Sequence, residues 1–256
     1  MTAVRPTTPV DDGSAVVHCA TRVDWHETEK LLKLSYPVDV HAERARFETQ
    51  FGHVSRPIHE NTSWDAARFE VCAHRWVHVG DGVGVAIAND SSYGHEVRRV
   101  ARQGGGMNTI VRVSLLRAPT YPDPDTDHGE HEFRTAIVPS AGIGDAVRAG
   151  YELNIPLREG VGMPVEPLVA VTGDGVVVEA VKLSEDGSQD VIVRLYESLG
   201  QTSVARVSAN FDVAKVREVD LLERPMEQLS LRRDPVLIGD VVTLRPFEIA
   251  TLRFVR

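Results

Sequence analysis

The chain has 256 residues, of which 42% are hydrophobic and 25% are charged, a composition typical of globular proteins rather than of disordered or membrane proteins. Asp and Glu outnumber Lys and Arg by 37 to 28, so the net charge of -9 opposes binding to a nucleic-acid backbone. No apolar run approaches the roughly 20 residues that span a bilayer, and we therefore expect a water-soluble protein without nucleic-acid or membrane partners.

The first part of the chain is predicted to contain a flexible lead-in followed by strands. Residues 1–14 are rich in Thr, Pro and Asp without periodicity, so order should begin near Ala15. Residues 41–52 contain good helix formers, but their apolar side chains alternate with charged ones, which favours a half-buried strand. Short β-branched and apolar stretches between turn residues predict strands at residues 38–51, 67–79, 84–88 and 109–116.

The rest of the chain is divided by a loop and by a second region, both with a low propensity to form helix or strand. Residues 120–130 concentrate Pro, Asp and Gly in a loop before a strand at residues 133–138, whereas residues 158–167 predict a domain boundary. Helical turns are indicated only at residues 145–151 and 217–222. The final third shows a hairpin turn at residues 185–190 and short strands at residues 176–183, 191–196, 203–208, 241–244 and 249–255.

The predicted fold class is therefore all-β. Strands of four to eight residues separated by Gly, Asp or Pro are the pattern of an antiparallel β-sandwich. We expect two consecutive sandwich units, one over residues 15–160 and a smaller one over residues 165–256.

Two segments combine histidines with carboxylates, DWHETEK at residues 24–30 and DHGEHE at residues 127–132. A zinc site needs ligands that converge at about 2.0–2.2 Å, and a loop rich in Pro and Asp supplies ligand types without fixing their directions. We therefore predict no metal site in this chain. Cys19 and Cys72, the only cysteines, have neither zinc nor disulfide spacing, which is typical of a cytoplasmic protein.

The chain contains no sequence motif for nucleophilic catalysis or for phosphate binding. Ser63, Asp65 and His74 could be combined into a triad, but the G-x-S-x-G turn that presents a serine nucleophile does not occur. The glycine-rich residues 103–106 lack the Lys and the Ser or Thr of a phosphate-binding loop, so we predict a hairpin tip there. We therefore assign no catalytic residue.

Two other segments carry side chains of the kind that bind sugars, NTSWDAARFEV at residues 61–71 and NDSSYGHEV at residues 89–97. Sugar rings stack on aromatic faces, and their hydroxyls need fixed donors and acceptors such as Asn, Asp and Arg. The same residue types also cap turns and fill cores, so composition alone leaves both interpretations open.

Taken together, these segments resemble the C-terminal region of family 38 α-mannosidases, in the subgroup of bacterial enzymes and the cytosolic eukaryotic enzyme. The resemblance covers nearly all of residues 23–254 and implies a mutarotase-like large sandwich followed by a small terminal sandwich. It rests on long strings, among them VDWHETEKLLKLSYPVDVHAERARFETQFG, GVGVAIANDSSYGHEV, VSLLRAPTYPDPDTDHGEHEFRTAIVP and VVVEAVKLSEDGSQDVIVRLYESLG.

Members of this family are retaining, metal-dependent exo-α-mannosidases whose N-terminal α/β domain holds the zinc and an Asp nucleophile. No position of this chain matches those residues, so the resemblance implies a non-catalytic portion, with the zinc in a catalytic domain outside this chain. The implied partners are that catalytic domain and α-mannosides, and the open edges of a truncated sandwich favour a homo-oligomer. A free-standing carbohydrate-binding or assembly module is the alternative.

The resemblance also implies where substrate is contacted. In the family the β region lends residues to the rim of the sugar pocket, and the NDSSYG stretch is the part of this chain that we place there. We expect Asn89, Asp90 and Tyr93 to bind substrate, with Arg68 and Trp64 as further candidates.

Overall fold

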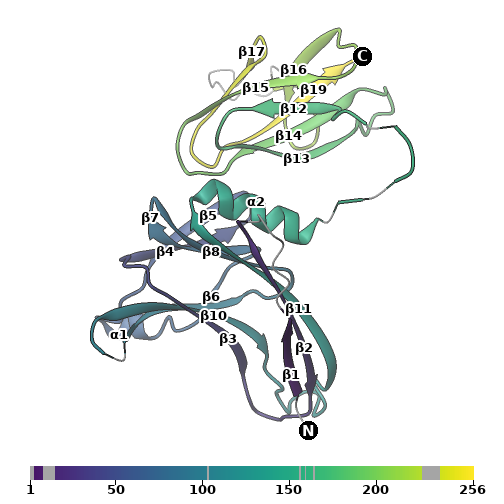
Figure 1. Cartoon of the computed structure of the whole chain (residues 1–256). Helices are drawn as coiled ribbons and strands as arrows, with labels where there is room; N and C mark the ends of the chain where they lie inside the picture. Colours follow the sequence, from purple (N-terminus) through teal and green to yellow (C-terminus); the bar gives the residue numbers. More distant parts are fainter. Residues whose placement is uncertain are drawn as a thin grey trace. The chain divides into compact units, whose positions relative to one another are not determined.

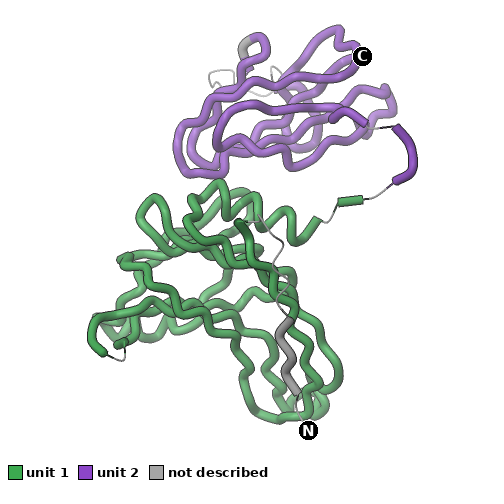
Figure 2. The backbone as a smooth tube through the Cα atoms, in the orientation of Figure 1, with its two compact units in different colours: residues 1–158 green, residues 159–256 purple. Residues whose placement is uncertain are grey.

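The computed structural model describes the backbone of residues 3–7, 15–102, 104–155, 157–158, 160–163, 165–226 and 237–256. The chain divides into two units, Met1–Arg158 and Glu159–Arg256, which are described separately below (Figure 2). Both units consist of antiparallel sheets that pack into sandwiches, so the prediction of an all-β fold is confirmed.

The larger sheet of the first unit has seven antiparallel strands (Figure 1). Their spatial order is β1 (Ala3–Thr7), β2 (Val17–Trp25), β11 (Gly129–Ala141), β8 (Val83–Asn89), β7 (Trp76–Asp81), β4 (Arg44–Thr49) and β5 (Gly52–Pro57). Strand β1 lies within the segment that was expected to be a flexible lead-in, and it pairs with β2 from Ala3 opposite Asp24 to Thr7 opposite Ala20. Its position at the sheet edge tolerates Pro6, which has no N–H to donate to a further strand.

The smaller sheet of this unit has four strands, and the core lies between the two sheets. Its order is β3 (Leu32–Val38), β10 (Met107–Leu116), β9 (Gly94–Ala101) and β6 (Val71–Cys72). The core combines Phe47, Val77 and Ile87 of the larger sheet with Val111 and Val113 of the smaller one, all at most 2% exposed. This pairing of inner faces makes the unit a sandwich.

Helix α2 (Ile143–Asn154) covers the other face of the larger sheet, against β7, β8 and β11. It contains the helical turn that was predicted at residues 145–151 and extends it at both ends. Because β7 has the core on one side and α2 on the other, five of its six residues are buried and it shows no alternation.

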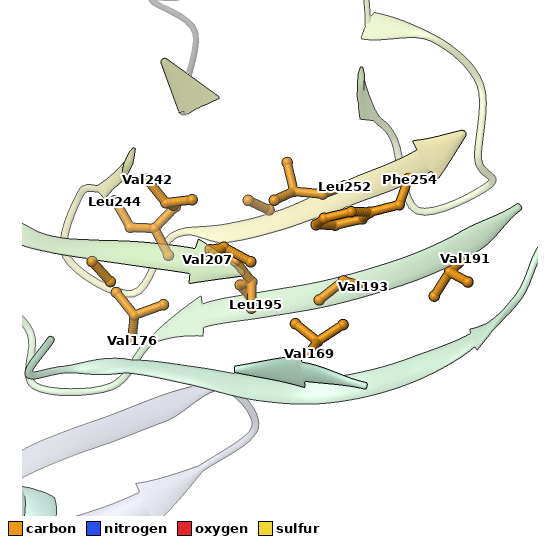
Figure 3. Packing of buried hydrophobic residues seen from close by; sticks show 12 residues of the cluster. Val169, Val176, Val191, Val193, Leu195, Val207, Val242, Leu244, Leu252 and Phe254 are labelled. Atoms are coloured by element: carbon orange, nitrogen blue, oxygen red, sulfur yellow. The ribbon is translucent and has the colours of Figure 1, made fainter. Parts of the chain in front are cut away.

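The second unit is a sandwich of two four-stranded antiparallel sheets. One sheet has the order β12 (Val169–Thr172), β15 (Ser203–Ala209), β18 (Val241–Leu244) and β17 (Leu237–Ile238), and the other has the order β13 (Val176–Leu183), β14 (Val191–Glu197), β19 (Ile249–Val255) and β16 (Lys215–Val219). Apolar side chains from both sheets fill the space between them (Figure 3). Val193, Leu195, Leu244 and Leu252 in this core are completely buried.

Several sequence-based predictions of local structure were wrong. Residues 217–222 are not helical, because β16 pairs with β19 and the chain then turns. The strand predicted at residues 67–79 is interrupted: helix α1 (Ser63–Ala66) and a turn precede β6, and β7 starts only at Trp76. Strand β9 was not predicted, since its first residues were interpreted as part of a sugar-binding loop.

None of the helices in the described part of the chain is long and apolar enough to cross a membrane.

Candidate functional site

The turn between β8 and β9 is organised by Asn89, the last residue of β8. Its Oδ1 accepts hydrogen bonds from the backbone N–H groups of Ser91 (3.2 Å) and Ser92 (2.8 Å), which forms an Asx turn. Its Nδ2 donates to the carbonyl oxygen of His74 at 2.8 Å. Asn89 is only 3% exposed, so its amide shapes the turn from within.

Asp90 attaches the same turn to strand β11. One carboxylate oxygen accepts the backbone N–H of Arg134 at 3.1 Å, and the other accepts Arg134 Nε at 2.9 Å. The backbone N–H of Asp90 in turn donates to the carbonyl oxygen of Arg134 at 3.2 Å. Both Asn89 and Asp90 therefore position the turn, in which Ser91 and Tyr93 are exposed to solvent while Ser92 is buried.

Tyr93 is the exposed aromatic side chain of this turn, with 61% of its surface accessible. Its ring meets the ring of His74 edge-on, with centroids 5.4 Å apart, and its carbonyl oxygen accepts the N–H of Ala73 at 3.0 Å. The Nε2 of His74 lies 3.0 Å from Nε2 of Gln50. We call Gln50, His74 and Tyr93 the Tyr93 rim; it offers an aromatic face beside polar groups, as sugar binding requires.

A buried ion pair supports the Tyr93 rim from below. Glu48 on β4 is 2% exposed, and its carboxylate accepts both the backbone N–H of Arg75 and Arg75 Nη2 at 2.6 Å. The guanidinium of Arg75 lies 3.9 Å from the centre of the Tyr151 ring on α2. Burial acts to lower the pKa of Arg75, but the hydrogen bonds and charge of Glu48 outweigh it and hold that pKa above its usual value.

His95 lies in the interior directly after the turn and is completely buried. Burial lowers its pKa to about 4, because an imidazolium would lose its hydration there. Its Nε2 lies 3.4 Å from Nδ2 of Asn89, so a neutral imidazole contributes to the organisation of the turn. This lowered pKa keeps His95 uncharged at neutral pH.

The structure places Trp64 and Arg68 in a different location, around helix α1. The helix starts with a capping box, in which Thr62 Oγ1 accepts the N–H of Asp65 at 3.1 Å and the Asp65 carboxylate accepts the N–H of Thr62 at 3.2 Å. The hydrogen bond from Thr62 is the main cause that lowers the pKa of Asp65. Trp64 and Phe69, before and after the turn that ends the helix, are 77% and 64% exposed.

A hollow of about 30 Å³ lies beside this helix, and we call it the α1 pocket. Its apolar part is formed by Phe47, Ile58, Phe69, Val71 and Val97, and its polar part by Arg56, His59, Glu60, Asp65, Arg68, Glu96 and Arg98. The Tyr93 rim contributes none of these lining residues, so the five predicted substrate contacts fall into two groups. Asn89, Asp90 and Tyr93 form one group, and Arg68 belongs to the other with Trp64 nearby.

Some residues at these two places could not be identified from the sequence. Gln50 reaches His74 only because β4 and the segment before β7 are neighbours in the sheet. Arg56 reaches the α1 pocket from β5, and Phe69 stands out only through its exposure. The Thr62–Asp65 spacing, in contrast, is a helix-start signal that can be found in the sequence.

The two histidine-carboxylate segments approach each other, since the ring centroids of His26 and His128 are 6.3 Å apart. His26 pairs with Asp24 at 2.7 Å, and His128 lies 3.5 Å from Asp125. Within the residues that the structure describes, however, no three His, Cys, Asp or Glu side chains converge in a way that could hold a metal ion. The described side chains therefore do not fit a zinc site.

The other rejected motifs have simple structural roles. Asp65 contacts Thr62 and lies 3.5 Å from His59, whereas His74 contacts Gln50 and Tyr93, so Asp65 and His74 have different partners. Gly104–Gly106 belong to the tip between β9 and β10, where Arg102 N–H donates to the Gly106 carbonyl at 3.0 Å. Gln103 lies outside the described residues.

Comparison with known families gives two matches along the chain. Residues 2–125 match the Glycosyl hydrolases family 38 C-terminal domain, and residues 175–252 match the Glycosyl hydrolases family 38 C-terminal beta sandwich domain. These matches fall in the first and the second structural unit respectively.

Similar proteins are considerably longer than this chain. Alpha-mannosidase 2C1 of Homo sapiens is 38% identical over 259 residues, which cover 96% of this chain and 24% of that protein. Alpha-mannosidase of Saccharomyces cerevisiae is 34% identical over 277 residues, 98% of this chain and 25% of that protein. The crystal structure of an alpha-mannosidase from Enterococcus faecalis V583 has the same fold, with a TM-score of 0.77 at 18% identity over 98% of this chain and 28% of its own. The chain spans about a quarter of the length of the curated relatives it matches.

Proposed function

Because this chain belongs to glycosyl hydrolase family 38, as a C-terminal portion of an α-mannosidase, we propose that it supports the hydrolysis of terminal α-mannosides when it is joined to a catalytic domain. The proposal is carried by the identity of 34–38% to two α-mannosidases over at least 96% of this chain. In this role the chain is a folded support, and the chemistry takes place outside it.

The Tyr93 rim is the part of the chain that we assign to the sugar pocket. Tyr93 would stack on a sugar ring, while His74 and Gln50 exchange hydrogen bonds with hydroxyl groups. Asn89 and Asp90 act as positioning residues, because their side chains are already engaged within the turn. Support comes from the combination of a 61% exposed ring with a turn that is held by the hydrogen bonds of Asn89 and Asp90.

The zinc and the nucleophile belong, in this proposal, to the catalytic domain that the resemblance implies. The described residues gather no metal-ligand set, and no catalytic role is assigned to them. A cytoplasmic location is part of the same proposal and is supported by the low cysteine content, since Cys19 and Cys72 are the only two cysteines and lack the spacing of a disulfide framework. Self-association is also proposed, with the open sheet edges β5 and β6 as its support.

The proposed sugar contact is tested by substituting Tyr93 in an enzyme that contains this chain together with its catalytic domain. Stacking of a ring contributes about 0.5–1.5 kcal/mol, so Tyr93→Ala should raise KM for an aryl α-mannoside by about five-fold, while Tyr93→Phe should retain most of the affinity. Tyr121→Ala is the matched control, because Tyr121 is 86% exposed on a loop outside the rim. An unchanged KM in Tyr93→Ala would remove the rim from the sugar pocket.

A second assay separates the supporting role from the free-standing alternative. The isolated chain, supplied with zinc, should show no turnover of an aryl α-mannoside, and addition of the catalytic portion should raise activity above that of the catalytic portion alone. If the isolated chain binds α-mannosides but never changes the activity of the catalytic portion, the free-standing module is the better description. Turnover by the isolated chain would contradict both.

A further inference from the structure

We propose that the α1 pocket, with Trp64 and Phe69 at its side, is a second carbohydrate-binding site, which takes a neutral pyranose unit. This inference goes beyond the proposed function, because the lining of the α1 pocket shares no residue with the Tyr93 rim. Four observations support it: the exposure of two aromatic side chains, the balanced charge of the pocket, a buried donor without an acceptor and the small size of the hollow.

Trp64 and Phe69 are exposed to an extent that packing does not explain. They are 77% and 64% exposed, whereas the other two tryptophans, Trp25 and Trp76, are 4% and 1% exposed. No residue of the four-residue helix α1 is buried, so Trp64 does not anchor the helix to the core. Flat aromatic faces in this state are suited to stacking against the apolar face of a sugar ring.

The charges around the hollow favour a neutral ligand. Its lining contains three guanidinium groups and three carboxylates, those of Arg56, Arg68, Arg98, Glu60, Asp65 and Glu96. An acidic or a basic ligand would therefore meet groups of both signs and gain little net attraction. Hydroxyl groups, in contrast, both donate and accept hydrogen bonds, and they match a site that offers donors beside acceptors.

One donor of the pocket has an unused hydrogen-bonding capacity. The Nε of Arg56 is buried and makes no hydrogen bond with any described residue, while its guanidinium carbon lies 5.8 Å from the centre of the Phe47 ring. A buried donor without an acceptor is unfavourable, because it has lost its hydrogen bonds to water and gained none in return. An acceptor oxygen supplied by a ligand would satisfy it.

The volume of the hollow limits how much of a ligand can enter it. Its volume of about 30 Å³ exceeds the roughly 10–15 Å³ that one water molecule needs, so a hydroxyl group of a ligand can enter. The sugar ring itself would then lie outside, over Trp64 or Phe69.

The test uses the fluorescence of the whole chain, in which Trp64 is the only tryptophan that is open to a quencher. Methyl α-D-mannopyranoside and α-mannotriose serve as neutral probes, and acrylamide serves as the quencher. We expect each probe to protect Trp64 in a saturable manner, with the quenching constant falling at least two-fold. The absence of saturable protection by both sugars would overturn the proposal.

Variants decide whether the protection arises at the α1 pocket. Phe69→Ala leaves Trp64 as the reporter and should weaken the apparent affinity at least five-fold, and Arg68→Ala should also weaken it. Tyr93→Ala, at the other place, should leave the affinity unchanged within two-fold. If Tyr93→Ala removes the protection and Phe69→Ala does not, sugar binds at the Tyr93 rim and the inference fails, while the proposed function stands.

Discussion

Two glutamates that lie in the interior show how single residues determine local structure in this chain. Glu48 and Glu197 are 2% and 0% exposed, and the oxygens of each accept hydrogen bonds from backbone N–H groups. Glu48 holds the segment before β7 in place, since its carbonyl oxygen accepts the N–H of His74. Glu197 does the same for the segment between β14 and β15, since its carboxylate accepts the N–H of Leu199. A carboxylate is suited to such positions because it has acceptor capacity on both oxygens and no donor.

The substitution Glu197→Gln should therefore destabilise the second unit strongly. The five donors to Glu197 are the backbone N–H groups of Leu199, Gly200, Gln201 and Phe247 and the hydroxyl of Ser203, at 2.8–3.3 Å. An amide would turn an NH₂ group toward some of these donors, so we expect a loss of about 3 kcal/mol in the free energy of unfolding. Calorimetry measures it, with Glu185→Gln as the control.

Glu185 is a suitable control because 82% of its side chain is exposed and its partner is a surface lysine. Its substitution should change the free energy of unfolding by no more than about 0.5 kcal/mol. Equal effects of the two substitutions would show that the hydrogen bonds to Glu197 are not the cause.

The lowered pKa of His95 should make the stability of the first unit depend on pH. Burial is the main cause that lowers its pKa to about 4, and burial also lowers the pKa of His78, so both bind a proton more readily in the unfolded chain. The contribution of neutral His95 to stability is therefore complete above the unfolded pKa of about 6.5 and is lost progressively as the pH falls toward 4.

Urea unfolding followed by tryptophan fluorescence checks this prediction, because all three tryptophans lie in the first unit. The unfolding midpoint should be lower at pH 5 than at pH 7, and this difference should shrink in His95→Gln. His41→Gln, which changes an exposed histidine, should keep the difference of the unsubstituted chain. A pH effect of the same size in His95→Gln would contradict the role of His95.

At the scale of elements, the packing of α2 on the larger sheet depends on one glycine. A Cβ atom at Gly150 would lie 3.0 Å from Cδ1 of Trp76 and 3.1 Å from Cβ of Arg75. The helix therefore approaches β7 as closely as a residue without a side chain allows. Since Arg75 also contacts Tyr151 and Glu48, this approach is linked to the frame of the Tyr93 rim.

The pair Gly150→Ala and Gly144→Ala tests this close approach with the same chemical change in the same helix. Alanine favours a helix over glycine by about 1 kcal/mol, but overpacking costs about 1–3 kcal/mol, so Gly150→Ala should lower the stability of the first unit. A Cβ at Gly144 would meet nothing within 4 Å, so Gly144→Ala should raise stability or leave it unchanged. Urea midpoints measure both, and a stabilising Gly150→Ala would refute the tight contact.

The elements that the sequence predicted correctly are those that are encoded locally. Alternation at residues 41–52 predicted β4, and the apolar stretches of the last third predicted most strands of the second unit. The failures depend on partners that are distant in the sequence. Strand β16 exists because β19 pairs with it, and Glu48 is buried because Arg75 and α2 cover a face that was predicted to be polar. Periodicity carries no information about such partners.

The same reasoning applies to the candidate site. The exposed Tyr93 and Trp64 were singled out from residue type together with the family resemblance, and the structure adds which neighbours they have. Their separation into two places could not be predicted, because it depends on the pairing of β6 with β9 and on the position of α1 at the end of the sandwich. Residue type therefore suggests candidate sugar contacts, and the topology of the sheets determines which of these residues lie close together.

At the scale of the whole molecule, each unit has a core of its own. The core of the second unit consists only of residues from Val169 to Phe254, and that of the first unit includes Phe47, Ile87 and Val113. The division after Arg158 falls within residues 158–167, the stretch with a low propensity to form helix or strand. A unit that buries its apolar side chains without help from the rest of the chain meets the main requirement for independent folding.

We therefore predict that residues 165–256 fold when they are produced alone. Both sheets of the second unit and every core residue that the structure describes for it lie within this segment, so the truncation retains this described core. The amide NMR spectrum should show the dispersion of a folded β protein, and heating should give a cooperative transition. Glu197→Gln should lower the free energy of unfolding of this segment as much as it does in the whole chain. A collapsed amide spectrum, or an effect of Glu197→Gln that appears only in the whole chain, would show that the second unit depends on the first for its stability.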